Sequence, residues 1–417
     1  MVTSRIAAGA AALALLAAVL GALLVTTPRT VVPSGAQAEI ARNFTPAEIA
    51  REVGFYRQVR PWSLGGMALS LAVTLLLGLT PLGSRLIAAV ARPFGGHWTA
   101  QAALGVTVLS LIGLAVTLPL SARSEVVLRR YGLSTQNWAG WWADVAKGWA
   151  VSAVLSIAAV LILFGVVRAA PRWWWAWLAA GAAAVAFALS FLYPVLIEPI
   201  FNQFSPMPHT ALRQELVDMA ARDGVPVKDV LVADASRRTT ALNAYVSGYG
   251  PSRRIVVYDT LLKSAPDAEV KLVVAHELGH AKFGDVLRST VVGALGAALA
   301  VCLLFLAAGA LGGRLEPRSL ALLLAVAAIA GLVTAPVASW ASRRTEARAD
   351  EHALELTGDP ATFVAMQRRL AIQNIADLDP PAILYFFYAS HPTTPERIAM
   401  ARDYAHRHHI ELAESPR

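Results

Sequence analysis

The chain has 417 residues, of which 56% are hydrophobic and only 15% are charged, and its formal net charge is +8. A soluble domain of this size carries about a quarter charged residues, so the composition excludes an ordinary soluble protein and predicts a surface that largely contacts lipid. The positive charge does not indicate a nucleic-acid partner, because no basic run is interleaved with aromatic residues; arginines and lysines instead flank apolar stretches, where lipid headgroups favour them.

Seven apolar stretches are long enough to cross a bilayer as helices, which takes about 20 residues. They cover residues 6–25, 63–82, 102–120, 149–167, 173–193, 291–311 and 320–340. The first could also be a signal peptide, but its length and the absence of a cleavage motif directly after it favour a retained helix. The sequence therefore predicts a mainly α, polytopic membrane protein. The single cysteine, Cys302, lies in the sixth stretch, so an intramolecular disulfide is excluded.

The distribution of cations predicts an orientation. Loops 26–62 and 121–148 together hold nine arginines and lysines, whereas the alternating segments up to residue 318 hold seven. Because cations favour the cytoplasmic side, we expect these two loops there, and by parity also residues 194–290 and 341–417. The lysine-poor, Ala/Leu/Arg-rich composition is typical of a high-GC bacterium, so we expect its plasma membrane.

We divide the chain into four parts: a membrane region with five spans (1–193), a first polar part (194–290), a membrane hairpin (291–340) and a second polar part with the C-terminal tail (341–417). In the first polar part, helical spacing over 211–225 ends at Gly224. Three β-prone runs follow, "DVLVADAS", "NAYVSGYG" and "RRIVVYDTLL", which predict a small antiparallel sheet. A further helix is expected to start with Ser264 as its N-cap and Asp267 three residues later.

That helix carries "HELGH", with His276 and His280 four residues apart and therefore on one face. Both imidazoles can bind one metal ion, and Glu277 lies beside it, where a carboxylate can take a proton from water. Two solvated histidines on a surface helix would show the same spacing. The apolar flank "KLVVA" favours a buried helix instead, in which unpaired histidine and glutamate would be costly.

A catalytic zinc needs a third protein ligand and one open position. "RRTEARADEHAL" offers Glu346 and Asp350, four residues apart on one helical face. We expect Glu346 to ligate zinc and Asp350 to hydrogen-bond a ligand histidine. The neighbouring arginines would also suit a solvated charged face. His352 could compete as a ligand, but its position around the helix favours Glu346.

Four motifs together, "HELGHAKFGD", "EARADEHAL", "NAYVSGYG" and "SHPTTPERI", resemble the membrane-embedded zinc metalloproteases typified by CAAX prenyl protease 1. The HtpX-type proteases are more distant relatives with fewer spans. The resemblance implies seven transmembrane helices and a gluzincin-type α+β zinc metalloprotease domain interrupted by a helical membrane hairpin.

The resemblance also implies roles for individual residues. One zinc per chain would be held by His276, His280 and Glu346, with Glu277 as the general base. Asp350 and Arg397 would support the site, and His391 would stabilise the developing oxyanion. The substrate backbone would bind along a strand edge at Asn243, Ala244 and Tyr245.

The sequence thus predicts an integral membrane zinc endopeptidase that processes or clears membrane-associated proteins or peptides, with lipidated substrates among the candidates. The alternatives are an HtpX-like quality-control protease and a non-enzymatic scaffold or transporter with a vestigial metal site. The spans contain almost no charges, which argues against a transport pathway.

Overall fold

The computed structural model describes residues 2–33, 36–310 and 315–412. Among these residues, seven helices are long and apolar enough to cross a membrane, as predicted. They are α1 (Val2–Thr26), α3 (Pro46–Leu79), α5 (Trp98–Arg130), α6 (Trp138–Ala169), α7 (Trp174–Leu192), α12 (Asp285–Ala310) and α13 (Leu320–Thr357). Residue 311, the last of the predicted sixth span, lies outside the described residues.

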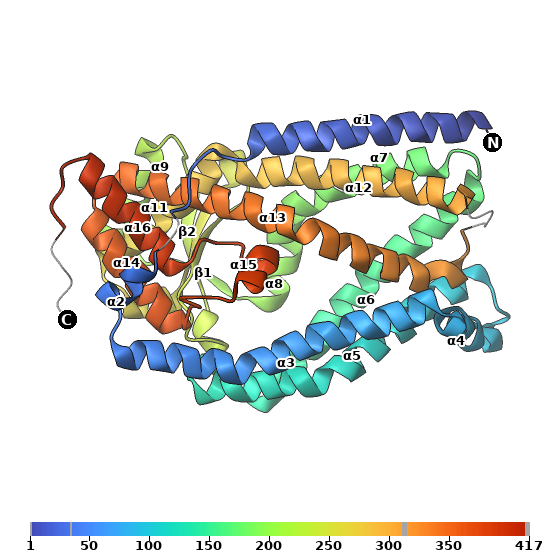
Figure 1. Cartoon of the computed structure of the whole chain (residues 1–417), viewed down its shortest axis with the longest axis horizontal. Coiled ribbons are helices and arrows are strands. Elements are labelled where there is room, and N and C mark those ends of the chain that lie inside the picture. Colours follow the sequence, from blue (N-terminus) through green and yellow to red (C-terminus); the bar gives the residue numbers. More distant parts are fainter. Residues whose placement is uncertain (1, 34–35, 311–314, 413–417) are drawn as a thin grey trace.

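The long helices extend from an end of the molecule that contains the sheet to the opposite end (Figure 1). α1 and α7 pack on α12 along one side, and α3 and α5 pack together along the other; α13 contacts α3, and α6 contacts α5. Many outward side chains of these helices are apolar and exposed, such as Leu13, Leu24 and Val154. Such a surface fits a lipid environment.

Local sequence sets several helix ends. Thr45 caps α3 by accepting a hydrogen bond from the Glu48 N–H, while Glu48 accepts one from the Thr45 N–H, and Pro46 occupies the first turn. Short helices lie near both ends of α3: α2 (Gln37–Asn43) before it, and α4 (Pro81–Ala91) with the 3-10 turn Arg92–Phe94 after it.

The sheet has four strands in the order β1-β2-β4-β3: β1 (Phe204–Pro206), β2 (Asp229–Ala233), β3 (Ala244–Ser247) and β4 (Arg254–Tyr258). The predicted antiparallel sheet is wrong for its central pair, because β2 and β4 run parallel. The chain passes from β2 to the far edge, forms β3, and returns between them as β4. Gly248 permits this return: its φ is +85°, and a Cβ there would lie 2.5 Å from the Ser252 carbonyl oxygen.

Helices α9 (Ala211–Arg222), α10 (Asp259–Ser264), α11 (Asp267–Phe283), α14 (Pro360–Asn374), α15 (Ala382–Tyr388) and α16 (Thr394–Arg407) complete the polar end. A short turn, Tyr193–Ile197, and α8 (Glu198–Phe201) connect α7 to β1. The core between sheet and helices is apolar and includes Leu216, Ile255, Val257, Leu278, Phe363 and Ile398. This core fixes α11 and the strands relative to one another.

The start of α11 differs from the prediction. Ser264 is the last residue of α10, and α11 begins at Asp267 after Pro266, without a side-chain cap. The first turn is stabilised instead by Glu269, which accepts hydrogen bonds from Arg369 of α14. A tertiary ion pair has therefore replaced the local cap that the sequence pattern indicated.

Two breaks in the chain matter for the site. α11 ends at Phe283, Gly284 adopts a left-handed conformation with φ of +65°, and α12 begins at Asp285. α13 runs without interruption from the membrane hairpin into the polar end. The four-part division of the chain stays a prediction.

Candidate active site

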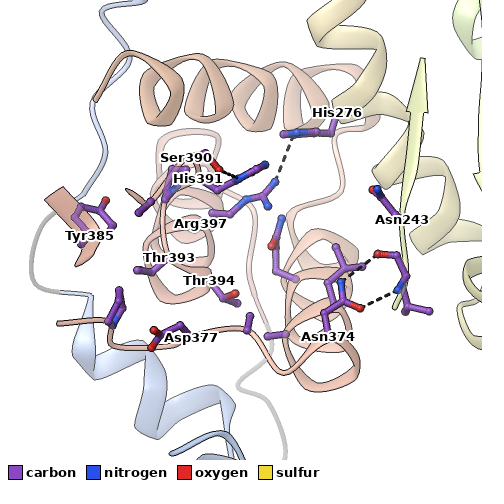
Figure 2. A pocket seen from close by; sticks show the side chains of 18 of the residues that line it. Asn243, His276, Asn374, Asp377, Tyr385, Ser390, His391, Thr393, Thr394 and Arg397 are labelled. Atoms are coloured by element: carbon purple, nitrogen blue, oxygen red, sulfur yellow. Dashed lines mark hydrogen bonds between the residues drawn. The ribbon is translucent and has the colours of Figure 1, made fainter. Parts of the chain in front are cut away.

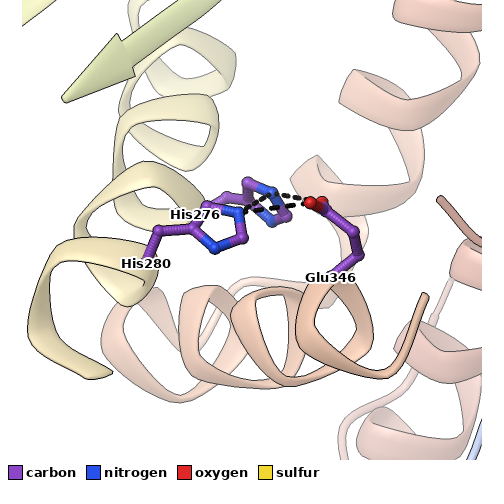
Figure 3. Close-up of side chains that lie close together, drawn as sticks. All are labelled: His276, His280 and Glu346. Carbon is purple, nitrogen blue, oxygen red and sulfur yellow. Dashed lines mark hydrogen bonds and ion pairs between the residues drawn. The ribbon is translucent and has the colours of Figure 1, made fainter. Parts of the chain in front are cut away.

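α11 carries His276 and His280 on one face, directed toward α13 (Figure 3). Their Nε2 atoms lie 3.2 Å apart. His276 is buried, whereas His280 and Glu277 are partly exposed. The four-residue spacing therefore brings both imidazoles to one point.

Glu346 of α13 faces the two imidazoles (Figure 3). Its Oε2 lies 3.2 Å from His276 Nε2, and its Oε1 lies 3.6 Å from His280 Nε2. One ligand atom from each of the three residues lies within 4.8 Å of the other two, a spacing that could hold a metal ion. Two imidazoles and a carboxylate are a donor set that suits Zn²⁺.

The electrostatics of this cluster also favour a cation. Burial alone would lower the pKa of His276, but hydrogen bonds to Asp350 and Glu346 outweigh it and raise the pKa. In the same way, Asp285 and Glu346 outweigh burial and raise the pKa of His280 to about 10. The surrounding carboxylates thus stabilise positive charge at the imidazoles, whether protons or a metal ion supply it.

The second nitrogen of each histidine is bonded to its own carboxylate. His276 Nδ1 lies 2.9 Å from Asp350 Oδ1, so its N–H donates to the fully buried Asp350. Arg397 of α16 in turn donates to Asp350, at 2.7 Å from Nε to Oδ2, and its Nη2 lies 3.4 Å from His276 Nδ1. Figure 2 shows Arg397 beside His276.

The corresponding partner of His280 was not singled out in the sequence. His280 Nδ1 lies 3.0 Å from Asp285 Oδ2, and Arg348 of α13 donates a hydrogen bond to Asp285. Asp285 is the last residue of the motif "HELGHAKFGD". The glycine before it could have indicated that Asp285 lies near His280, because a left-handed Gly284 turns the chain back toward the helix that it follows.

His352, the competing ligand considered from sequence, lies elsewhere. Its Nε2 is 3.0 Å from Asp223 Oδ2, and Lys282 also donates to Asp223. These residues tie α13 and α11 to the C-terminal end of α9, so His352 takes part in packing between helices.

Two cavities meet at Glu277. The first, about 560 Å³, is lined by Asn243, Glu277, Tyr385, His391 and Arg397, among others (Figure 2). The second, about 610 Å³, lies on the other side and has Glu277, Glu346, Val246, Tyr249 and Val286 in its wall. Asn243, directly before β3, lines the first cavity, and Val246 of β3 lines the second. We refer to the two adjoining cavities, which share Glu277, as the cleft.

His391 lies at this cleft on the loop before α16. Its Nε2 is 3.3 Å from Glu346 Oε2, its side chain is 56% exposed, and its Nδ1 is 2.8 Å from the Ser390 hydroxyl (Figure 2). An imidazole placed here can reach a group bound next to Glu346. The helix that follows is well capped, because Thr393 and Glu396 form a capping box.

The three predicted substrate-binding residues differ in what they expose. Asn243 is exposed at the first cavity, whereas Ala244 is buried as a whole residue, with 1% of its surface exposed. Tyr245 is partly buried; its hydroxyl lies 3.5 Å from Glu198 Oε2, and burial raises its pKa. β3 is an edge strand in the described sheet, so one side of its main chain is available for pairing.

Comparison with known proteins covers most of the chain. Residues 206–405 match Peptidase family M48, and residues 62–203 match the CAAX prenyl protease N-terminal region, described as five membrane helices. The uncharacterized metalloprotease YhfN of Bacillus subtilis is 31% identical over 312 residues, which are 71% of this chain and 72% of that relative. CAAX prenyl protease 1 of Saccharomyces cerevisiae is 25% identical over 359 residues, which are 80% and 77% of the two chains.

A solved structure has the same fold. The crystal structure of S. mikatae Ste24p superposes with a TM-score of 0.77 at 20% identity, covering 95% of this chain and 99% of that one. The seven long helices and the small sheet therefore form a known arrangement.

Proposed function

This chain belongs to peptidase family M48 and is an integral membrane metalloendopeptidase of the CAAX prenyl protease type; from that premise we propose that one Zn²⁺ per chain, held by His276, His280 and Glu346, serves peptide-bond hydrolysis. The observation that carries the proposal is the approach of the three ligand atoms to within 4.8 Å of one another, beside Glu277 in a cleft. When bound, zinc supplies a Lewis acid and lowers the pKa of water.

Glu277 acts as the general base: its carboxylate accepts a proton from the attacking water and passes it to the leaving amine. Burial raises the pKa of Glu277, and the two nearby imidazoles oppose that rise. A carboxylate with a raised pKa is a stronger proton acceptor, which suits a group that both takes up and releases a proton.

The developing charge on the carbonyl oxygen is stabilised by His391, whose imidazole lies at the cleft next to Glu346. Arg397 acts differently. It is bonded to Asp350 and therefore holds the carboxylate that orients His276.

Substrate binds as an added strand along β3. The Tyr258 N–H donates to the Asn243 carbonyl, so these residues form a hydrogen-bonded pair across β3 and β4. Because such pairs alternate with outward-facing ones, the main-chain groups of Ala244 and Val246 face away from β4. The Ala244 N–H donates to the Asn243 side chain, so the Val246 N–H is the donor that we expect to meet substrate. A substrate strand there spans both cavities and passes the metal site, with Asn243 and Tyr245 flanking it.

The substrates are membrane-associated proteins or peptides, including lipidated ones. The second cavity is lined partly by the membrane helices, through residues such as Leu23, Val292 and Ala338, so an apolar segment can approach the cleft from the bilayer. Comparing the cleavage of a farnesylated peptide with that of the same peptide without the farnesyl group distinguishes a protease that recognises lipid from a general one. Preferred cleavage of the farnesylated form supports lipid recognition, and equal cleavage supports a general quality-control protease.

The site lies on the cytoplasmic side of a bacterial plasma membrane, as the cation distribution favours. Cysteine labelling tests this, because Cys302 is fully buried and gives little background. In intact cells, a membrane-impermeant thiol reagent should label His97→Cys, directly before α5, and should not label Glu411→Cys, after α16. The reverse pattern contradicts the orientation.

The metal is tested on the detergent-purified full chain. We expect about one zinc per chain by elemental analysis, loss of cleavage of a quenched peptide library after chelation, and recovery on adding Zn²⁺. His280→Ala should lose both zinc and cleavage. Cleavage that survives complete metal removal contradicts the proposal.

A further inference from the structure

Helices α12 and α13, whose other ends cross the membrane, contribute two residues that meet at a candidate zinc ligand. Asp285 is the first residue of α12, and its Oδ2 lies 3.0 Å from His280 Nδ1. Arg348, from α13, donates a hydrogen bond to the other oxygen, Oδ1. Both side chains are largely buried, at 12% and 15% exposure.

Arg348 is itself fixed in place. Its guanidinium lies over the ring of Phe283, 4.3 Å from the ring centroid, and Phe283 is the last residue of α11. One side chain of α13 therefore contacts both sides of the Gly284 elbow, the end of the histidine-bearing helix and the start of the membrane helix. A planar guanidinium bonded to a carboxylate resists reorientation better than either group alone.

The Asp285 carboxylate can only accept a hydrogen bond, so His280 must carry its proton on Nδ1. The Nε2 lone pair is then directed to the point that His276 Nε2 and Glu346 Oε1 also face, at 3.2 and 3.6 Å. Asp285 thus selects the tautomer and the ring orientation that a metal requires.

We propose that Asp285 and Arg348 are positioning residues for His280, so that the first turn of membrane helix α12 forms part of the metal site and sets its zinc affinity. The inference rests on the proposed function, since it takes His280 to be a zinc ligand. It goes beyond the roles expected of Asp350 and Arg397, which act on His276 from α13 and α16.

The competing explanation is purely structural. An acidic residue in the first turn of α12 favours that helix through its dipole, and an ion pair between α12 and α13 holds the hairpin together. Such roles would change stability and leave zinc affinity alone. A measurement of zinc affinity therefore distinguishes the two explanations.

The experiment is a competition between the detergent-purified full chain and a chromogenic zinc chelator, with thermal unfolding of the same samples. Asp285→Asn keeps the size of the side chain and removes its charge; it should weaken zinc binding by about 10- to 100-fold. Arg348→Gln should weaken it less, and Arg348→Lys should recover part of the loss. Since Arg348 acts through Asp285, Arg348→Gln should add little once Asp285→Asn is present.

Glu269→Gln is the matched control. Glu269 is also a buried carboxylate bonded to an arginine, Arg369, and lies on the same α11 helix, two turns before His276. It should lower the melting temperature and leave the zinc dissociation constant unchanged.

The outcomes are distinct. If the wild type holds zinc and Asp285→Asn binds it equally well, the inference is overturned while the proposed function stands. If the effects of Asp285→Asn and Arg348→Gln are fully additive, Arg348 does not act through Asp285 and the inference is overturned for Arg348. A wild type that takes up no zinc contradicts the proposed function itself.

Discussion

His391 contributes to the cleft from a loop, and its imidazole is the group best placed to meet a carbonyl oxygen bound beside Glu346. Removal of one donor that stabilises an oxyanion costs about 10²- to 10³-fold in kcat. We expect His391→Ala to lower kcat by that factor and to leave zinc content unchanged, as measured by peptide cleavage and elemental analysis.

His408→Ala is the control for this substitution, because His408 stacks on Tyr404 at the end of α16. It should retain full activity. If His391→Ala keeps wild-type kcat, the oxyanion role is wrong; if it loses zinc, His391 acts at the metal instead.

Asp259 allows a test of pH dependence away from the metal. Burial raises its pKa, but hydrogen bonds from Lys263 and Ser236 outweigh burial and hold the pKa below its usual value of 3.8. Because the folded-state pKa is the lower one, the ionised group stabilises the fold above pH 3.8, and this contribution is lost as the pH falls through the depressed pKa.

Asp259→Asn should therefore destabilise the protein by about 1.5 kcal/mol at pH 7, the lower end of the range for hydrogen bonds to a charged group, because the side chain is partly exposed. Unfolding followed by tryptophan fluorescence should show that the difference between variant and wild type shrinks at acid pH. A difference that stays constant with pH contradicts the assigned hydrogen bonds.

At the residue scale, the sequence predicts most of the candidate site for a physical reason. His276, Glu277 and His280 lie on one helix, and Glu346 and Asp350 on another, so their relative directions follow from helical spacing. Asp285 and Arg348 could not be found in this way. Their meeting depends on the turn at Gly284 and on the packing of α13, which are set by tertiary structure.

The elbow between α11 and α12 is the element on which the His280 side of the site depends. Gly284 has φ of +65°, and a Cβ there would meet nothing within 4 Å. Gly284→Ala should therefore cost only the backbone strain, about 1 kcal/mol, and should weaken zinc binding if the strain displaces Asp285.

Gly293→Ala is the matched control, since Gly293 lies within α12 and a Cβ there also meets nothing within 4 Å. It should be neutral or slightly stabilising, because alanine is the better helix former. Equal destabilisation by both substitutions contradicts the importance of the elbow.

The free edge of β3 is the second element with a measurable consequence. Val246→Pro removes an N–H that we expect to face substrate, while the paired groups of Tyr245 and Ser247 remain bonded to β4. Loss of one hydrogen bond of about 1 kcal/mol should raise KM about 5-fold, with a smaller effect on kcat. Val246→Ala should have little effect on KM. An unchanged KM in the proline variant contradicts strand addition.

The sequence patterns predicted two features incorrectly: the pairing of the strands and the start of α11. Periodicity shows that β2 and β4 are strands but cannot give their order, and β4 inserts between β2 and β3 to make a parallel pair. The pattern at Ser264 and Asp267 resembles a helix start, yet Pro266 begins the helix and Arg369 stabilises its first turn through Glu269. Long-range contacts decide both cases.

At the scale of the whole molecule, the long apolar helices connect the candidate active site to the membrane. α12 begins at the site, and α13 extends from the hairpin through Glu346 and Asp350 without a break (Figure 1). The seven spans were predictable because each is long and apolar enough to cross a bilayer. How they pack was not, since lipid-facing and protein-facing apolar residues look alike in sequence.

The central claim is that a protein-bound metal and Glu277 together hydrolyse peptide bonds. The most direct test compares wild type with Glu277→Gln for zinc per chain and for cleavage of a quenched peptide library, with Glu351→Gln as a control carboxylate on α13 that pairs with Arg407. We predict equal zinc in all three proteins and a loss of cleavage by about 10²- to 10⁴-fold in Glu277→Gln alone. Cleavage by Glu277→Gln at the wild-type rate, with zinc bound, would contradict the account.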